Sequence, residues 1–476
     1  MDTIFHLSER RDATPPEVDI PAAYRRQEPL DLPNPSELEA LRHYTLLSQK
    51  NFAIDTHFYP LGSCTMKYNP RIAHRLANLA GFARVHPATP ASAQQGLLHL
   101  LWDLQNGLAQ LTQMAAVSLT PAAGAQGELA GVAMIRAYHH ARGDLGRRRM
   151  LIPSAAHGTN PASARMAGFT VTELPTRADG DLDLAALERE LGPDVAGIML
   201  TNPSTLGVFE RQIETIAERV HQAGALLYYD GANLNAILGR VAPGRMGFDV
   251  MHLNLHKTFA TPHGGGGPGS GAVAAAAHLE PYLPLPRVQR EADGSWRWFD
   301  RVDCPQSIGR LSAHAGNIGV LLRAQAYLRR LGGSGAHRVS AYAVLNANYL
   351  FKELQRVGYR AAFPQRRASH EFLLTVEDLR QQTGVRALDV AKRLLDFGIY
   401  APTIYFPQLV PECLLIEPTE TESKATLDRF VAVMAQIRQE ALEQPELLKD
   451  APHQLTVGRL DEAWAARHLE LVQGRC

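Results

Sequence analysis

Short runs of apolar and β-branched residues alternate with longer amphipathic stretches in the middle of the chain. Because strands buried on both faces appear as continuous apolar runs, the short runs predict a largely parallel sheet, and the amphipathic stretches predict its connecting helices. Alternation of this kind is typical of an α/β domain. The predicted strands are 116–120, 149–153, 169–174, 195–201, 225–229 and 249–254, and the predicted helices are 127–141, 182–191 and 211–223.

The pattern before this region is different. Prolines interrupt the stretch between Pro15 and Pro35 too often for a long helix, which indicates an extended arm. Helices are then predicted at 36–48, with Ser36 as N-cap, at 70–79 and at 92–111. We therefore assign residues 1–90 to an N-terminal arm with helices.

The pattern changes again after a predicted helix at 316–332, which should end in the glycines that begin at Gly332. Strands at 371–376 and 413–416 and helices at 387–397 and 422–443 indicate a smaller α+β domain. We accordingly predict a large α/β domain at 91–332 and a small C-terminal α+β domain at 333–476.

Composition excludes several classes of partner. The 476 residues include 48 Lys plus Arg and 48 Asp plus Glu, so the formal net charge is zero. Broad binding to nucleic acid or to anionic membranes needs a basic surplus, and neither is expected. No run of about 18 apolar residues predicts a membrane span. The N-terminus has no secretory signal pattern, and four scattered cysteines fit a reducing compartment, so a cytoplasmic location is expected: Cys64, Cys304, Cys413 and Cys476.

A lysine after the last predicted strand gives the strongest chemical signal. Lys257 stands beside His256 and ahead of the glycine run that begins at Gly264. A lysine at a strand end can be desolvated enough to form a Schiff base, and the glycines allow close approach of a ligand. The alternative is a surface lysine beside a flexible loop, and the flanking pattern disfavours it.

An acidic residue ends the preceding predicted strand. Asp230 would be costly to bury there unless it met a cation, and the protonated pyridine nitrogen of pyridoxal phosphate is such a cation. An aspartate that caps the next turn is the alternative. Since ligands of parallel sheets bind at the carboxyl ends of strands, Asp230 and Lys257 should face one crevice.

Three further strand ends complete a possible cofactor site. The amides of Gly124, Ala125 and Gln126 open a predicted helix and could bind a phosphate, or form an ordinary strand–helix turn. His157 could stack on a planar ring or cap a helix. Thr201 could donate its hydroxyl to the phenolic oxygen of the ring or belong to a turn.

The sequence gives weaker support for a metal site or a cysteine nucleophile than for a cofactor site. His252 and His256 lie four apart on a strand-to-loop stretch, where they do not share a face as helical ligands would, so no metal site is expected. Cys64 could be a nucleophile, but no distinct base is visible near it in the sequence.

The motifs together resemble a known family. FYPLGSCTMKYNP at 58–70, AGAQGE at 123–128, HGTNPASA at 157–164 and NLHKTFATPHGGGGPG at 254–269 are similar to the P-protein of the glycine cleavage system. The resemblance implies a fold-type I pyridoxal-phosphate enzyme, with a large domain built on a mostly parallel, mixed sheet and a smaller C-terminal α+β domain. The length resembles the lysine-bearing half of the single-chain form, which is subunit 2 of the two-subunit form.

The resemblance also implies roles for individual residues. Lys257 would hold pyridoxal 5'-phosphate as a Schiff base, with His256 beside it. Asp230 would pair with the pyridine nitrogen, His157 would stack on the ring and Thr201 would bond its oxygen. The substrate glycine would be bordered by Ser63, Thr65 and Lys67.

The implied reaction is decarboxylation of glycine, with release of CO₂ and transfer of the aminomethyl group to the lipoyl arm of H-protein. A separate subunit 1 should complete a heterotetramer of two copies of each chain. The alternatives are other fold-type I enzymes. A cysteine desulfurase would need a mobile cysteine, and an aminotransferase would bind the substrate carboxylate through an arginine such as Arg366 or Arg367.

Overall fold

The computed structural model describes residues 19–26, 32–86, 88–264 and 269–469. The chain forms two compact units, Met1–Thr56 and His57–Cys476. In the first unit a short 3-10 helix, η2 (Ala22–Tyr24), precedes α1 (Glu37–Gln49). Ser36 accepts the amide of Glu39, whose carboxylate accepts the amide of Ser36, so a reciprocal capping box starts α1 where the sequence predicts it.

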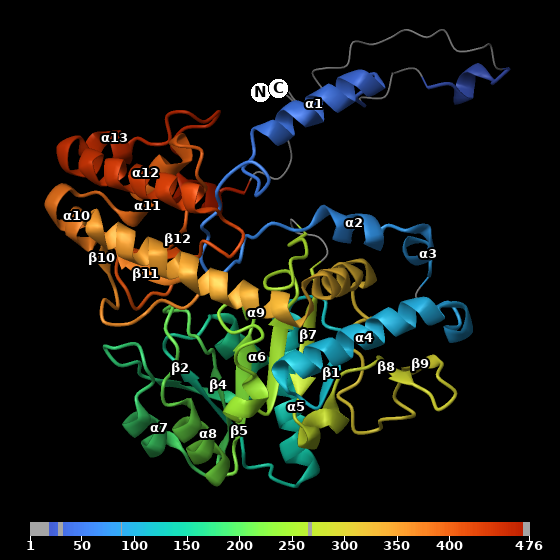
Figure 1. Cartoon of the computed structure of the whole chain (residues 1–476). Coiled ribbons are helices and arrows are strands. Elements are labelled where there is room, and N and C mark those ends of the chain that lie inside the picture. Colours follow the sequence, from blue (N-terminus) through green and yellow to red (C-terminus); the bar gives the residue numbers. More distant parts are fainter. Residues whose placement is uncertain (1–18, 27–31, 87, 265–268, 470–476) are drawn as a thin grey trace. The chain divides into compact units, whose positions relative to one another are not determined.

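A seven-stranded sheet forms the centre of the second unit (Figure 1). Its order is β1-β7-β6-β5-β4-β2-β3, and β7 runs antiparallel to both of its neighbours while the other adjacent pairs are parallel. The six predicted strands are confirmed, and β7 is added. The strands are β1 (Ala116–Ser118), β2 (Arg149–Pro153), β3 (Thr170–Leu174), β4 (Val195–Leu200), β5 (Leu226–Gly231), β6 (Val250–Asn254) and β7 (Gly271–Ala275).

Helices cover both faces of this sheet, because alternate strand residues enter two separate apolar cores. Apolar side chains of α5 (Gly124–Ala141) and α6 (Thr159–Met166) join one core with Tyr228 and Val250. The other core holds Tyr229 and Met251 and receives side chains from α4 (Gln95–Thr112), α7 (Leu184–Glu190), α8 (Ile213–Gln222) and the start of α9 (Ile318–Arg356). The remaining elements around the sheet are α2 (Arg71–Ala77), α3 (Ala80–Ala83), η3 (Ala91–Ala93), η4 (Pro243–Met246), η5 (Ala277–Tyr282) and the hairpin β8 (Arg287–Arg290) with β9 (Trp296–Phe299).

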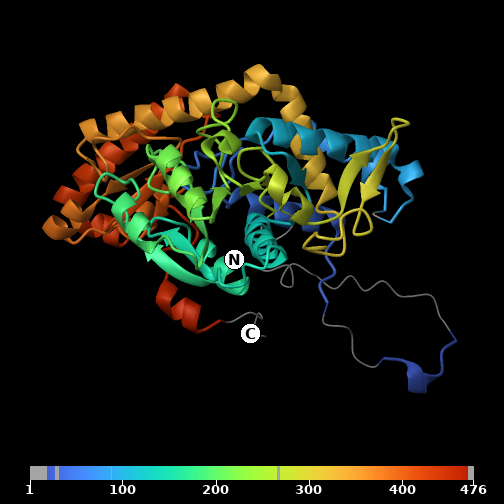
Figure 2. The same ribbon diagram turned by 90° about the horizontal axis from the view of Figure 1, so that it is seen from below.

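Helix α9 runs from the large sheet toward the C-terminal elements in both views (Figures 1 and 2). The predicted helix end at Gly332 is confirmed, because α9 consists of two helices that meet at a kink there. Gly332 breaks the helical geometry, with φ 58° and ψ −175°, but the chain resumes the helix directly afterwards. Ala336, Val339 and Ala343 are buried at helical spacing, so packing restarts the helix that the glycines interrupt.

The C-terminal elements form an antiparallel sheet of order β10-β11-β13-β12 with its own apolar core. The strands and helices predicted beyond residue 370 are confirmed. Both sheets belong to one compact unit, and the domain boundaries at 90 and 332 stay predictions. The elements are β10 (Arg360–Ala361), β11 (Phe372–Thr375), β12 (Thr403–Ile404), β13 (Cys413–Ile416), α10 (Glu377–Thr383), α11 (Ala387–Asp396), α12 (Lys424–Glu443), α13 (Pro445–Lys449) and α14 (Glu462–Arg467).

The segment at 57–68 joins the two sheets. Phe58 bridges Ile399, and Leu61 bridges Ile416 beside the C-terminal sheet. A Cβ atom on Gly62 would lie 2.3 Å from Leu415 Cγ, so only glycine permits this close approach. The segment then leads into α2, which packs on α9. Among the described helices, none has the length and apolar character needed to cross a bilayer.

Candidate active site

A cavity of about 270 Å³ lies at the carboxyl ends of the parallel strands. This is where parallel sheets bind ligands, because the loops that follow the strands converge there. The C-terminal sheet and the 57–68 segment contribute a second wall. The lining residues predicted from the sequence are Ser63, Gly124, Ala125, His157, Thr201, Asp230, His256 and Lys257.

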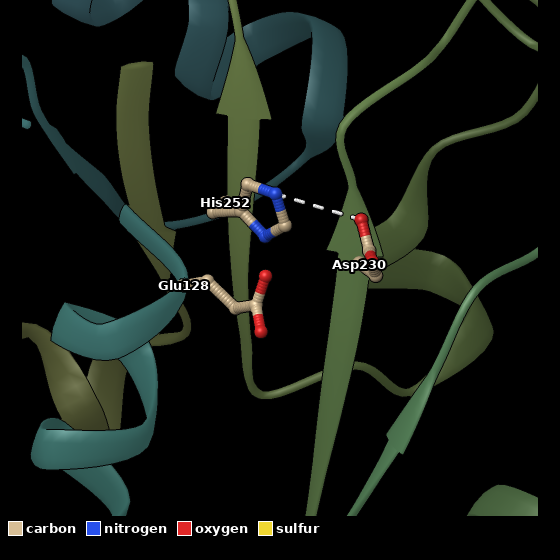
Figure 3. Close-up of side chains that lie close together, drawn as sticks. All are labelled: Glu128, Asp230 and His252. Atoms are coloured by element: carbon tan, nitrogen blue, oxygen red, sulfur yellow. Dashed lines mark ion pairs between the residues drawn. The ribbon is translucent and has the colours of Figure 1, made fainter. Parts of the chain in front are cut away.

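Asp230 and His252 lie opposite each other on β5 and β6, and Glu128 of α5 points toward both (Figure 3). His252 Nε2 is 3.5 Å from Asp230 Oδ1, and His252 Nδ1 is 2.5 Å from the hydroxyl of Tyr228. Because the carboxylate of Asp230 can only accept, the imidazole proton is assigned to Nε2, and Nδ1 accepts from the Tyr228 hydroxyl, whose pKa burial raises far above its usual value. The proton of the neutral imidazole then faces Asp230.

Glu128 is tied to the neighbouring residues of the cavity wall. Thr159 Oγ1 donates to Glu128 Oε2 at 2.8 Å and lies 2.9 Å from His157 Nδ1. With its amide nitrogen turned toward the carboxyls, Asn160 donates to both Glu128 and Asp230, at 2.9 and 3.2 Å. Burial, followed by the charge of Asp230, raises the pKa of Glu128 to about 7. This cluster of two carboxyls therefore favours a cationic ligand atom.

Lys257 follows β6 and lines the cavity with His256. Burial, followed by His263 and by Lys257, lowers the pKa of His256 to about 4, so the ring is neutral. His256 Nδ1 is 3.1 Å from the carbonyl of Ser270, which fixes the ring beside the lysine. Of the glycine run, residues 265–268 lie outside the described part of the chain.

The first turn of α5 presents backbone amides to the cavity at Gly124 and Ala125. The N-cap residue Ala123 makes no side-chain capping bond. A Cβ atom on Gly124 would lie 1.9 Å from Asn254 Oδ1, so a glycine here lets Asn254 approach the helix start. The side chain of Gln126 points elsewhere: it accepts the amide of Ala122 and donates to the carbonyl of Leu311.

Three buried polar atoms of residues that line the cavity have no hydrogen-bond partner within the described protein: Thr201 Oγ1, Asn254 Oδ1 and His370 Nε2. Unsatisfied buried polar atoms are rare, and they point to a missing ligand or solvent partner. His157 is exposed on the cavity wall and meets Phe406 edge-on, with ring centroids 5.5 Å apart. Together with the cationic preference near Asp230, these features fit a flat, phosphorylated, protonated ring.

The residues predicted to border the substrate separate into two groups. Ser63 lines the cavity, and its amide donates to Glu371 Oε2 at 2.7 Å. Thr65 lies behind it and donates to Glu417 Oε1 at 2.7 Å. Lys67 does not line the cavity: its Nζ is 2.7 Å from Glu420 Oε1, and its side chain is 1% exposed. The lysine charge is thus already balanced away from the crevice, by the carboxylate of Glu420.

Comparisons with known proteins show the family to which this chain belongs. Residues 14–293 match the sequence model of the family described as glycine cleavage system P-protein, and residues 339–453 match the model described as glycine dehydrogenase, C-terminal domain. The chain belongs to the glycine cleavage system P-protein family. It is 63% identical to a probable glycine dehydrogenase (decarboxylating) subunit 2 of Legionella pneumophila over 95% of this chain and 93% of the relative. For the proteins of the same name in Methylococcus capsulatus and Coxiella burnetii, the values are 64% over 95% and 92%, and 60% over 98% and 95%.

Solved structures show the same fold. A crystal structure of an inhibitor-bound glycine decarboxylase P-protein of the glycine cleavage system matches with a TM-score of 0.71 at 22% identity, over 91% of this chain and 94% of that one. A cysteine desulfurase from Thermococcus onnurineus matches with a TM-score of 0.63 at 16% identity, over 81% and 95%. The predicted fold-type I pyridoxal-phosphate enzyme fold is therefore confirmed for this P-protein family member.

The side chains required by the alternative enzymes lie elsewhere in this P-protein family member. Arg366 donates to Asp181 and to the carbonyls of Asp179 and Phe209, and no arginine is among the described residues that line the cavity. Cys304 and Cys413 are buried and donate to backbone carbonyls. Neither an arginine for an aminotransferase nor a loop cysteine for a desulfurase is thus present in the described cavity wall, and Cys476 lies outside the described residues.

Sequence reasoning missed several residues that line the cavity. Glu128 lies within a predicted helix, and His252 and Asn254 lie within a predicted strand, so the pattern alone does not mark them as residues that line a cavity. His370 and Glu371 come from the C-terminal sheet, more than a hundred residues beyond Lys257. The one available signal was the acidic residue that directly precedes or follows an apolar strand, as at Glu371 and Glu417.

The raised pKa of Glu128 predicts a pH-dependent stability for the cofactor-free protein. The folded state binds more protons than the unfolded state between the ordinary glutamate pKa and about 7, so stability falls as pH rises through this window. We expect Glu128→Gln to reduce the change in unfolding free energy between pH 5 and pH 8 by up to about 3 kcal/mol. Urea unfolding at pH 5 and pH 8 measures it, and an unchanged pH dependence in the variant contradicts the assignment.

Proposed function

We propose that this protein decarboxylates glycine with pyridoxal 5'-phosphate, releases CO₂ and transfers the aminomethyl group to the lipoyl arm of H-protein. The observation that carries the proposal is the convergence of Lys257, Asp230, His157 and Thr201 on one cavity, in a member of the P-protein family. The names of the relatives at 60–64% identity, glycine dehydrogenase (decarboxylating) subunit 2, support the reaction.

The cofactor would be held by groups that the cavity already presents. Lys257 would bind it covalently, and Asp230, supported by the Nε2–H of His252, would hold the proton of its pyridine nitrogen. Gly124, Ala125 and Gln126 would offer backbone amides to the phosphate, and Thr201 would donate its unpaired hydroxyl to the ring oxygen. When bound, pyridoxal phosphate supplies an electron sink for the pair left at Cα when CO₂ departs.

The protein then has to orient the substrate and exclude competing protons. The exposed ring of His157 offers a flat surface, so it would hold one face of the cofactor against the cavity wall. Ser63 and the neighbouring Thr65 would border the glycine, since the 57–68 segment closes the cavity from the side of the C-terminal sheet. Lys67 would affect the bound glycine only indirectly, by anchoring the 57–68 segment.

We also propose the partners. A subunit 1 would join two copies of this chain in a heterotetramer, in keeping with the "subunit 2" in the relatives' names, and a lipoylated H-protein would accept the aminomethyl group. A cytoplasmic location, first predicted from cysteine usage, belongs to the same proposal. Light scattering of the two chains mixed and separate tests the assembly, and the absence of a mixed species would overturn it.

The test of the reaction is exchange of labelled bicarbonate into glycine by the two subunits with pyridoxal phosphate and lipoylated H-protein. We expect label in the glycine carboxylate only when all components are present. Transamination of glycine in place of exchange would instead support the aminotransferase alternative.

The unpaired hydroxyl of Thr201 gives a prediction with opposite signs for stability and binding. Thr201→Val replaces a buried, unsatisfied hydroxyl by a methyl group, so the cofactor-free protein should be as stable or more stable. Cofactor affinity should fall by about 0.5–1.5 kcal/mol, or roughly twofold to twelvefold, because one hydrogen bond is lost. Thermal unfolding and fluorescence titration measure the two effects, and unchanged affinity would remove Thr201 from the cofactor site.

A further inference from the structure

Two buried glutamates lie opposite each other where the C-terminal sheet meets the cavity. Phe372 on β11 pairs with Ile416 on β13, so the residues just outside this pair, Glu371 and Glu417, are brought face to face. Both carboxyls are almost completely buried, at 3% and 0% exposure. Like charges directly opposite each other in a sheet are destabilising, so one carboxyl should hold a proton.

The hydrogen bonds of the two glutamates indicate which carboxyl holds the proton. Glu417 accepts from the hydroxyl and amide of Thr65, at 2.7 and 3.2 Å, and from Asn233 Nδ2 at 3.0 Å. Glu371 accepts one bond, from the amide of Ser63. Three donors stabilise a carboxylate at Glu417, and Glu371 is left as the protonated partner. Burial and then the charge of Glu417 raise the pKa of Glu371, and burial also raises that of Glu417 against its donors.

The loop that supplies these donors has an unusual backbone. Ser63 and Thr65 have φ values of 64° and 51°, in the left-handed region that non-glycine residues rarely occupy. Such residues cost about 1–3 kcal/mol each and persist where the surroundings enforce them. Here the conformation lets the amide of Ser63 donate to Glu371 and the amide of Thr65 donate to Glu417.

Glu371 lines the same cavity as Lys257, whereas Glu417 lies behind it. The other titratable groups described around the pair are Lys257, Cys64, His263 and His370. Burial and Lys257 lower the pKa of His370 to about 3, and burial raises that of the Cys64 thiol. The imidazole is therefore neutral, and the thiol is a weaker acid than usual. Among the groups described around this wall, Glu371 is the carboxylic acid that keeps its proton at neutral pH.

The proposed reaction requires such a proton. When the aminomethyl carbon bonds to one sulfur of the lipoyl disulfide, the S–S bond breaks and its electron pair remains on the second sulfur. The carbon is oxidised and the disulfide is reduced, and the released sulfur has to take up a proton to become a thiol. We propose that Glu371, the protonated member of the pair, is the general acid that protonates this sulfur. The pair then recovers its proton from solvent.

This inference rests on the proposed function, and the experiment separates the two. The holoenzyme with subunit 1 is given labelled glycine and oxidised lipoylated H-protein. Glycine binding is followed by the absorbance of the cofactor, and thiol appearance on H-protein is followed by alkylation. We expect Glu371→Gln to preserve the glycine-induced absorbance change and to slow thiol formation at least about 10²-fold, the lower range for a general acid. Glu422→Gln, a partly buried carboxyl outside the cavity, should leave both unchanged.

A second measurement does not depend on turnover. In the cofactor-free protein at neutral pH, infrared difference spectra should contain carbonyl bands of protonated carboxyls, to which Glu128 also contributes. The band of Glu371 should be absent from Glu371→Gln and present in Glu422→Gln. Glu417→Gln removes the neighbouring charge, so loss of this band, and of rapid thiol formation, should move to lower pH. A purely structural pair would not shift these pH profiles.

The outcomes are distinct. A wild-type enzyme that forms no thiol from glycine sinks the proposed function and this inference with it. Normal thiol formation by Glu371→Gln, or loss of glycine binding in the same variant, overturns the general-acid role alone. The atoms of His370, Glu371 and Glu417 also lie within 4.8 Å of one another, close enough for a metal ion. Tight Zn²⁺ binding to the cofactor-free protein that Glu371→Gln abolishes would make the cluster a metal site and overturn the role as well.

Discussion

Replacing Lys257 by alanine should abolish the yellow absorbance of the cofactor-loaded protein and reduce kcat by at least about 10³-fold, as expected for removal of a covalent catalyst. Lys257 is the cavity lysine on the loop after β6, and no second lysine is among the described lining residues. The variant should fold normally, because the side chain is half-buried and points into the cavity.

Lys352→Ala is the matched control, since Lys352 is exposed on α9 far along the chain from the cavity loops. It should retain absorbance and activity. Absorbance spectroscopy after desalting, followed by glycine-dependent CO₂ release, measures both variants. A Lys257→Ala protein that keeps a covalently bound cofactor through desalting would show that another lysine holds it.

Replacing Lys67 by methionine should destabilise the protein by about 3–5 kcal/mol, the cost of leaving one partner of a buried ion pair alone. Glu420 would lose the ammonium at 2.7 Å, and the hydroxyl of Tyr327 and the amide oxygen of Asn235 would lose a donor at 3.2 and 3.4 Å. Burial lowers the pKa of Lys67, but Glu420 and Tyr327 outweigh it and the pKa is raised overall, so the lysine is charged.

The double variant Lys67→Met, Glu420→Leu should recover much of this loss, because removal of both charges leaves neither uncompensated. Lys424→Met breaks an exposed pair with Asp428 and should change the midpoint of urea unfolding little. If Lys67→Met unfolds like wild type and weakens glycine binding, the lysine acts at the substrate, as the sequence motif implied.

The sequence predicted the parts of the site that follow the strands of the large sheet. The positions of Asp230, His157, Thr201 and Lys257 depend on local order alone, because parallel strands deliver their carboxyl ends to one edge. The cavity brings these four residues together. Their individual roles stay predictions, and the substitutions proposed above test them.

The wall opposite could not be predicted in the same way. Glu371 and Glu417 are separated by 46 residues and meet through the antiparallel register of β11 and β13, which no local pattern specifies. Lys67 shows the same limitation, since its motif places it near the substrate while its partner Glu420 lies 353 residues later. The break at Gly332 shows the reverse case: a local glycine signal is enough to predict where the first of the two helices in α9 ends.

The bonds between the 57–68 segment and the C-terminal sheet also set the order in which the protein can mature. Thr65 and Glu417 are 352 residues apart, so the wall of the cavity closes only after Glu417 has left the ribosome. The large sheet can collapse earlier, since its contacts are more local. A nascent chain would thus display Lys257 and Asp230 before the cavity is complete, and the cavity would close only once the C-terminal sheet has been synthesised.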